Sequence, residues 1–197
     1  MGSKAFSWMK RLAGVGILTL GASSDWAAGS VQSVQACAGE PAPGFARCHA
    51  HIVVDQHGVI AASATPDVSG YGPADLRAAY NITGNGNPAT VIAIVDAYHY
   101  ATAEADLGVY RSQYGLPACT KANGCFKQLN QKGKAKKYPA TNQGWNQEEA
   151  LDIQMASAIC PACKIVLVEA NSASFANLAA AVQTASKIPG VLVISNS

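Results

Sequence analysis

The chain has 197 residues, of which 49% are hydrophobic and only 13% are charged. That length is enough for one domain with a sizeable core, and the composition argues against an intrinsically disordered chain. The formal net charge of +2 provides no strongly basic surface, so we expect no nucleic-acid partner.

The N-terminus has the features of a secretory signal peptide. A positively charged stretch ends at Arg11, and an apolar run over residues 12–22 follows it. This run is too short to span a membrane. Small residues at 27–30 predict cleavage nearby, so we assign residues 1–28 to the signal peptide. We therefore expect a secreted or periplasmic protein with no membrane attachment after signal cleavage.

Six cysteines fit an oxidising compartment. They fall into three pairs of near neighbours, and short loops favour pairing within each of them. The expected disulfides are Cys37 with Cys48, Cys119 with Cys125, and Cys160 with Cys163.

Cys160 and Cys163 also have the Cys-x-x-Cys spacing of redox proteins. In thioredoxin-like proteins that motif opens a helix, whereas here it follows a predicted helix and precedes a predicted strand. We therefore expect a structural disulfide. A periplasmic redox protein is the less favoured alternative, as are free thiols or a metal site at this pair.

Residues 29–70 have an irregular pattern. The pattern at 49–55 predicts a short strand, and small residues over 61–70 indicate a linker. His49 and His51 flank one residue, as a pair of metal ligands can, but no third ligand lies nearby. We interpret them as a surface pair and predict no metal site.

From residue 71 onward, helical and strand patterns alternate. The predicted strands are apolar runs at residues 90–96, 125–130, 164–170 and 191–195. The predicted helices cover residues 71–81, 103–114, 145–159 and 175–185. This alternation predicts an α/β fold with a parallel sheet flanked by helices. Ligands of such folds bind at the carboxyl ends of the strands, which here carry Asp96, Glu169, Asn171 and Asn196.

The helix predicted at 145–159 carries two carboxylates of interest. Its apolar stripe consists of Leu151, Met155, Ala158 and Ile159, whereas Glu149, Gln154 and Ser157 lie off that stripe. Glu148 and Asp152 fall within the stripe and lie on adjacent turns. Burial and mutual repulsion raise the pKa of at least one such acid, and this makes the pair suitable for acid–base chemistry below neutral pH. The alternative is that both acids extend toward the positive end of the helix dipole.

Other motifs are absent or weak. The sequence has no Gly-rich phosphate loop and no Gly-x-Ser-x-Gly nucleophile motif. Asp96 has the strand-end position of the subtilisin aspartate, but no histidine lies in a matching context, so we favour a capping or loop-ordering role. Four lysines within 132–137 indicate a solvated loop.

Four segments in order resemble one known family. They are residues 71–81, residues 91–96, the Glu148-x-x-x-Asp152 motif and residues 191–197. Together they resemble the first part of the catalytic domain of sedolisins, the serine-carboxyl peptidases. The resemblance covers about residues 71–197. It implies a subtilisin-like α/β fold and an acid-active endopeptidase with protein or peptide substrates.

The resemblance also implies roles for the acid pair. In the family's Ser-Glu-Asp triad, Glu148 would be the general base and Asp152 would hydrogen-bond to it. The family's Ser-Gly-Thr-Ser nucleophile motif, its oxyanion-stabilising Asp and its C-terminal calcium site all lie downstream of the matched region. None is present in residues 1–197, and neither Ser195 nor Ser197 lies in the nucleophile motif.

We therefore expect residues 71–197 to be the N-terminal part of a peptidase catalytic domain with an incomplete, truncated sheet. Without the nucleophile, this part alone is expected to be inactive. The family's long folded propeptide is replaced here by only the short segment 29–70. A truncated, non-catalytic secreted relative is the main alternative. Peptide specificity and oligomeric state are not predicted.

Overall fold

The computed structural model describes residues 32–55, 57–59 and 70–197, which belong to one compact unit that begins at Val31. The predicted signal peptide at residues 1–28 and nearly all of the predicted linker at 61–70 lie outside the described residues. No helix in the described part of the chain is long and apolar enough to cross a membrane.

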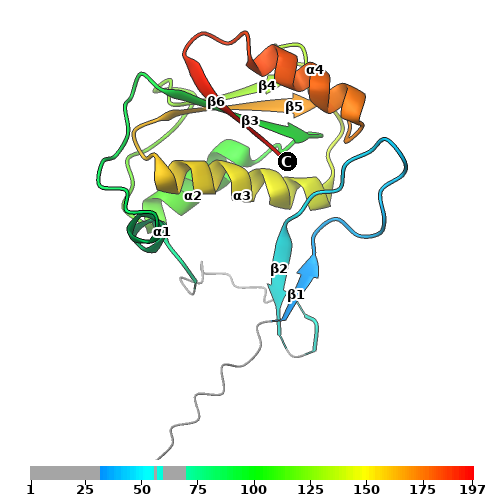
Figure 1. Ribbon diagram of the computed structural model, residues 1–197, viewed down its shortest axis with the longest axis horizontal. Helices are drawn as coiled ribbons and strands as arrows, with labels where there is room; N and C mark the ends of the chain where they lie inside the picture. The colour runs from blue at the N-terminus through cyan, green and yellow to red at the C-terminus, as the bar shows by residue number, and fades with distance from the viewer. Residues whose placement is uncertain (1–31, 56, 60–69) are drawn as a thin grey trace, which may run out of the picture. The chain divides into compact units, whose positions relative to one another are not determined.

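Helices and strands alternate after residue 70 (Figure 1). The helices are α1 (Pro73–Ala79), α2 (Ala103–Gln113), α3 (Gln143–Ile159) and α4 (Phe175–Ala185). The strands are β3 (Val91–Ala97), β4 (Phe126–Asn130), β5 (Lys164–Ala170) and β6 (Val191–Asn196). These strands form one parallel sheet in the order β4-β5-β3-β6. The predicted α/β fold with a parallel sheet is confirmed.

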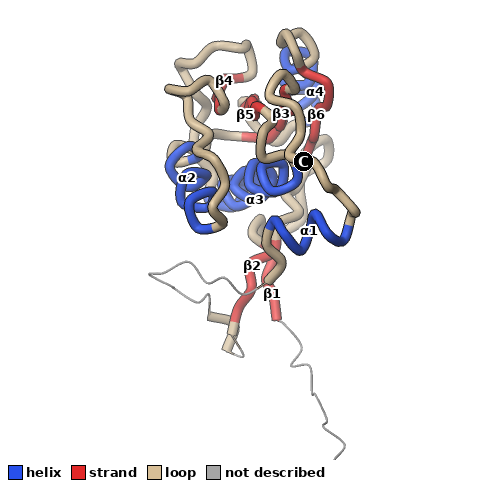
Figure 2. The backbone as a smooth tube through the Cα atoms, turned by 90° about the vertical axis from the view of Figure 1, so that its left-hand side faces the viewer, coloured by secondary structure: helices blue, strands red, loops and turns tan. Residues whose placement is uncertain are grey.

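The sheet lies between two layers of helices (Figures 1 and 2). On one face, α4 packs against side chains such as Val95 and Val168. On the other face, α2 and α3 pack against Ile94 and Leu167. Successive side chains along a strand point to opposite faces, so both faces of β3 and β5 are buried. This burial explains why their sequences are continuous apolar runs.

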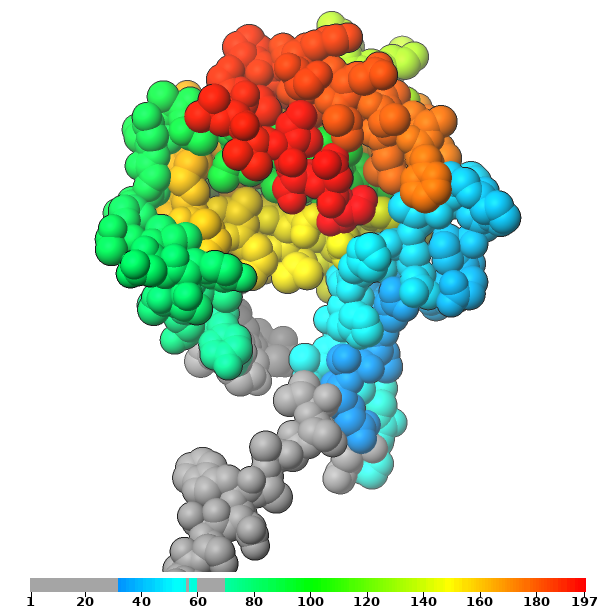
Figure 3. Space-filling view, in the orientation of Figure 1, coloured from blue at the N-terminus to red at the C-terminus, as the bar shows by residue number. Residues whose placement is uncertain are grey.

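β6 is an edge strand whose side chains are less buried than its apolar sequence suggests. It pairs with β3 alone, and Leu192 is 74% exposed. The strand lies at the surface in Figure 3, where it is coloured red. Its predicted strand conformation is confirmed, but its side chains are less buried than those of β3 and β5.

A second, two-stranded sheet lies in the segment before residue 70. β1 (Gln32–Gln35) pairs antiparallel with β2 (His51–Val54). β2 confirms the strand predicted at 49–55, but the expectation of irregular structure elsewhere in 29–70 missed β1. The sequence of β1 is mostly polar, so its strand conformation depends on pairing with β2 rather than on an apolar pattern.

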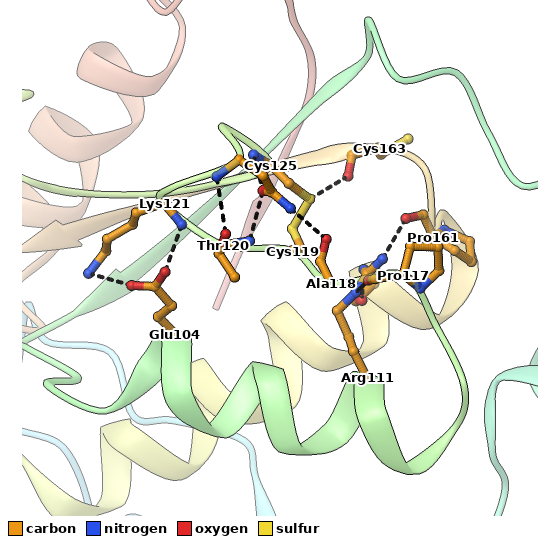
Figure 4. The surroundings of a disulfide bond; sticks show 12 residues. Glu104, Arg111, Pro117, Ala118, Cys119, Thr120, Lys121, Cys125, Pro161 and Cys163 are labelled. Atoms are coloured by element: carbon orange, nitrogen blue, oxygen red, sulfur yellow. Dashed lines mark hydrogen bonds and ion pairs between the residues drawn. A yellow bond between two sulfur atoms is a disulfide. The ribbon is translucent and has the colours of Figure 1, made fainter.

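The cysteines pair as predicted, in the disulfides Cys37–Cys48, Cys119–Cys125 and Cys160–Cys163. The second closes the turn before β4 (Figure 4), where Lys121 forms an ion pair with Glu104 of α2 at 3.5 Å. The third joins the end of α3 to the start of β5, which is the position expected for a structural disulfide.

Arg111 of α2 is buried beside this region and ties α2 to its neighbours (Figure 4). Its guanidinium donates to the carbonyls of Pro117 and Pro161 and to the Ser157 hydroxyl of α3. Burial lowers the pKa of Arg111 below its ordinary value.

The buried face of α3 differs from the predicted stripe. The side chains facing the sheet form a row with a spacing of four residues, namely Trp145, Glu149, Ile153 and Ser157. Leu151, which the sequence pattern placed in the core, is 43% exposed. Met155 and Ile159 instead line an apolar cavity together with residues of the α1 region. The predicted stripe is therefore only partly confirmed, because Ala158 is fully buried whereas Met155 and Ile159 face α1. Glu149 and Ser157, which were predicted to lie off the stripe, are fully buried.

Candidate functional site

Two of the predicted strand-end residues lie side by side beneath α3. On β3, Asp96 follows Ile94 on the same face, and on β5, Glu169 follows Leu167 in the same way. Asp96 and Glu169 are register partners and are both fully buried. Partners in register point to the same side of a sheet, so both carboxyls lie on the face that α3 covers. Asn196 pairs with Val95 and therefore lies on the opposite face.

Glu169 is completely satisfied by hydrogen bonds. The Tyr100 backbone N–H donates to it at 3.0 Å, and the Gln128 amide donates at 2.6 Å. The Nδ1 atom of His99 lies 2.8 Å from its second oxygen, and the His99 ring stacks on Tyr138 with 4.4 Å between the ring centroids. Glu169 thus fixes the loop between β3 and α2 at the carboxyl edge of the sheet.

Asp96 has no hydrogen-bond partner among the described residues. The capping or loop-ordering role favoured from the sequence is therefore wrong, because such a role requires the carboxylate to accept a backbone N–H. Burial raises the pKa of Asp96 well above its ordinary range, and the neighbouring Asp152, Glu148 and Glu169 raise it further. Both effects favour the protonated form of Asp96.

Glu148 and Asp152 lie on adjacent turns of α3, as predicted. Glu148 is 3% exposed and accepts a hydrogen bond from the backbone N–H of Ala50, and Asp152 accepts one from the hydroxyl of Ser197. Neither acid lies in the first turn, where Asn142 caps the helix by accepting from the Trp145 N–H. The alternative that both acids extend to the helix N-terminus is therefore wrong.

The two acids interact electrostatically, but the hydrogen bond from Asp152 to Glu148 that the family resemblance implied is not formed, because each acid has another partner. The pKa of Asp152 is raised chiefly by burial and also by the charge of Glu148, while the hydrogen bond from Ser197 opposes the shift. A carboxyl with a raised pKa next to a second carboxyl is a common feature of acid–base sites.

Sequence reasoning missed a further buried acid, Glu149. The acids that interact with one another here are called the carboxyl cluster below, namely Asp96, Glu148, Glu149, Asp152 and Glu169. Glu149 is fully buried on the sheet side of α3, and neither of its carboxyl oxygens has a hydrogen-bond partner among the described residues. Burial raises its pKa to about 11, with Asp96, Glu169 and Asp152 contributing. The available signal was its place, four residues from both Trp145 and Ile153, in the row that faces the sheet.

The carboxyl cluster receives little positive charge. In the described ranges, no lysine or arginine forms an ion pair with any of its members, and His99 is the basic group that contacts it. The described part of the chain contains no group of three or more His, Cys, Asp or Glu side chains arranged to hold a metal ion. Neighbouring members of the cluster interact electrostatically, as carboxyls that share a proton do.

Comparison with known proteins gives a likeness of fold. No family model and no curated protein matches the sequence. A solved structure described as "Pseudomonas sedolisin (serine-carboxyl proteinase) complexed with two molecules of pseudo-iodotyrostatin" is similar, with a TM-score of 0.50 and 19% sequence identity. The similarity covers 66% of this chain and 35% of that chain, so this chain spans about a third of the solved protein's length. It establishes a distant structural relationship.

Proposed function

We propose that this chain carries the acid pair of a secreted, acid-active serine-type endopeptidase with protein or peptide substrates. The observation that carries the proposal is the placement of Glu148 and Asp152 on adjacent turns of α3, beneath the carboxyl end of the sheet. The fold likeness to a serine-carboxyl proteinase supports this reaction class, and three disulfides support an extracellular location.

In the proposed reaction, the hydroxyl oxygen of a serine attacks the substrate carbonyl carbon while Glu148 accepts the hydroxyl proton. Glu148 then returns that proton to the leaving amine. Asp152 lies one turn away and has a raised pKa, so the two acids share a proton between them.

We place the nucleophilic serine outside residues 1–197, because neither serine near the end of β6 lies in a nucleophile motif. Ser197 instead donates its hydroxyl proton to Asp152. The calcium implied by the family resemblance belongs to a downstream site, and the described residues present no carboxylate group suited to it. No step of the proposal involves calcium.

The test is peptide cleavage by the full-length gene product between acid and neutral pH. We expect activity to peak at acid pH and Glu148→Gln to lower kcat/KM by at least about a thousand-fold, as loss of a triad base does elsewhere. Glu104→Gln is the matched control, since Glu104 is a carboxylate at the surface beside Lys121. An active Glu148→Gln variant would refute the assignment, and an inactive wild-type protein would favour a non-catalytic relative.

A further inference from the structure

Residues 36–50, which connect β1 to β2 and are called the N-terminal loop below, form part of the hydrophobic core. Cys48 of this loop is fully buried in a cluster with Ala97 at the end of β3, Trp145 of α3 and Ala173. Removing the loop would expose Trp145 and the carboxyl end of the sheet to water. A segment that only passes over the surface would not share a core in this way.

Backbone hydrogen bonds attach the N-terminal loop to the start of α4. The Ala46 N–H donates to the Ala173 carbonyl at 2.8 Å, and the Phe175 N–H donates to the Gly44 carbonyl at 2.9 Å. Figure 3 shows this part of the loop, in light blue, against the orange start of α4. An isolated antiparallel bridge between Phe45 and Ser174 thus joins the loop to the segment before α4.

A glycine on α3 allows the N-terminal loop to approach closely. A Cβ atom at Gly144 would lie 2.7 Å from the Ala36 carbonyl oxygen and 2.8 Å from the Cys37 sulfur. These distances are too short for any other residue without displacement of the loop. The second residue of α3 therefore permits the loop to dock, although glycine is a poor helix former.

The last residue of the N-terminal loop contacts Glu148. The Ala50 N–H donates to Oε2 of Glu148, and the Ala50 carbonyl accepts from the Ala36 N–H at 2.8 Å. Between Ala36 and Ala50, the Cys37–Cys48 disulfide closes the loop. A carboxylate has lone pairs on both oxygens, so one N–H on Oε2 fixes the side chain and leaves Oε1 available to accept a proton.

We propose that the N-terminal loop stays in the mature protein as a fixed part of the site, and that the Ala50 amide is the positioning group for Glu148. The second half of this inference rests on the proposed function. The opposing interpretation is a removable segment that blocks Glu148, and the experiments below separate the two.

The first experiment determines the N-terminal sequence and intact mass of the native secreted protein. We expect a mature chain that begins before Cys37 and contains the Cys37–Cys48 disulfide. Because this disulfide lies wholly within residues 36–50, cleavage after Ala50 would release the loop. A mature chain that begins after Ala50 would overturn the proposal without any variant having to fold.

The second experiment removes the Ala50 donor. Ala50→Pro lacks the backbone N–H, whereas Ala50→Gly retains it. We expect Ala50→Pro to lower kcat by about 10- to 100-fold with KM within about 2-fold of wild type, because a misplaced base slows the chemical step and leaves substrate binding intact. Unchanged or increased activity in Ala50→Pro would overturn the proposal, and an increase would identify a blocking segment.

The third experiment displaces the loop from the α3 side. Gly144→Ala should reproduce the loss of kcat, whereas Gly108→Ala in α2 should have no effect, because a Cβ at Gly108 meets nothing within 4 Å. Wild-type activity in Gly144→Ala would count against a positioning role.

A fourth measurement is independent of peptidase activity. Hydrogen exchange of the Ala50 amide should be at least about 10-fold faster in Glu148→Gln than in wild type, because a neutral amide oxygen is a weaker acceptor than a carboxylate. Equal exchange rates would overturn the Ala50–Glu148 contact. Loss of the proposed function alone, seen as an inactive wild-type protein, would leave this result and the N-terminal sequence unaffected.

Discussion

Asp96 and Glu169 lie side by side on β3 and β5, fully buried in the same register, yet among the described residues Glu169 has three hydrogen-bond donors and Asp96 has none. Burial of a carboxylate without donors favours its protonated form, whereas donors favour the charged form. Two neighbouring acids on the same face of the sheet therefore differ in role because they differ in hydrogen-bond donors. Asp96 lies near the acid pair of α3, and Glu169 organises the loop that carries His99.

This difference predicts opposite effects of two conservative substitutions on stability at neutral pH. Asp96→Asn should raise the free energy of unfolding by about 1 kcal/mol or more, because the native state no longer has to keep an acid protonated. Glu169→Gln should lower it by about 2–3 kcal/mol, because His99 and the Tyr100 N–H lose a charged acceptor. Urea denaturation of the secreted protein measures both. Equal destabilisation by both variants would show that Asp96 is charged and has a hydrogen-bond partner in the folded protein.

Glu149 predicts how stability changes with pH. Its pKa is raised from an ordinary 4.5 to about 11, so the folded state keeps a proton that the unfolded state loses. Its contribution is fully favourable below about pH 4.5 and is lost as pH rises toward 11, by up to about 1.4 kcal/mol per pH unit. Asp96 and Asp152, whose pKa values are also raised, act in the same direction.

We therefore expect the melting temperature of the wild-type protein to fall between pH 5 and pH 8, and Glu149→Gln to fall distinctly less. Glu104→Gln is the control, because that acid lies at the surface. Scanning calorimetry over this range gives the comparison. Parallel pH profiles for wild type and Glu149→Gln would mean that Glu149 ionises in the folded protein.

The sequence predicted the fold better than the site. Apolar runs and helical spacing located the strands of the parallel sheet, because burial on both faces of β3 and β5 leaves a continuous signal. Short spacing predicted the three disulfides. The spacing of four residues placed Glu148 and Asp152 on one face, because that relationship is fixed by helix geometry alone.

The remaining features depend on contacts that no local pattern encodes. α3 packs against the sheet, α1 and α2 at the same time, so its apolar residues did not identify the side on which Glu149 is buried. The Ala50 N–H reaches Glu148 across 98 residues of sequence, and a backbone amide has no sequence signal. β1 is defined by its partner strand and not by its own polar residues.

Removing the buried Arg111 guanidinium should lower the free energy of unfolding. Arg111→Met keeps the length of the side chain but leaves the Pro117 and Pro161 carbonyls without their donor. We expect a loss of about 2–4 kcal/mol in the free energy of unfolding. Arg47→Met should change it by less than about 1 kcal/mol, because Arg47 pairs with the exposed Glu40. Denaturation midpoints of the two variants test this. Comparable midpoints would show that water replaces the Arg111 donor.

Gly86, in the loop before β3, lies against the Cys160–Cys163 disulfide. A substitution at this position tests how much the close contact between the loop and the disulfide contributes to stability. The φ of Gly86 is +87°, and an added Cβ would lie 2.0 Å from the Cys160 sulfur. Gly86→Ala should therefore destabilise the protein by at least about 2 kcal/mol, from backbone strain and from displacement of the disulfide. Gly84→Ala should be nearly neutral, since nothing lies within 4 Å of its added Cβ.

The two causes can be separated in a variant in which Cys160 and Cys163 are both serine. If displacement of the disulfide is the larger cause, Gly86→Ala should cost less in this background, because the smaller oxygen atoms leave more room for the Cβ. A double-mutant cycle on the free energy of unfolding measures this coupling, which we expect to exceed about 0.5 kcal/mol. An unchanged effect in both backgrounds would assign the whole loss to the left-handed backbone at residue 86. In that case the contact with Gly86 does not position the disulfide, and the hydrogen bond from the Ala162 N–H to the Asn85 carbonyl, at 2.9 Å, is the contact that does.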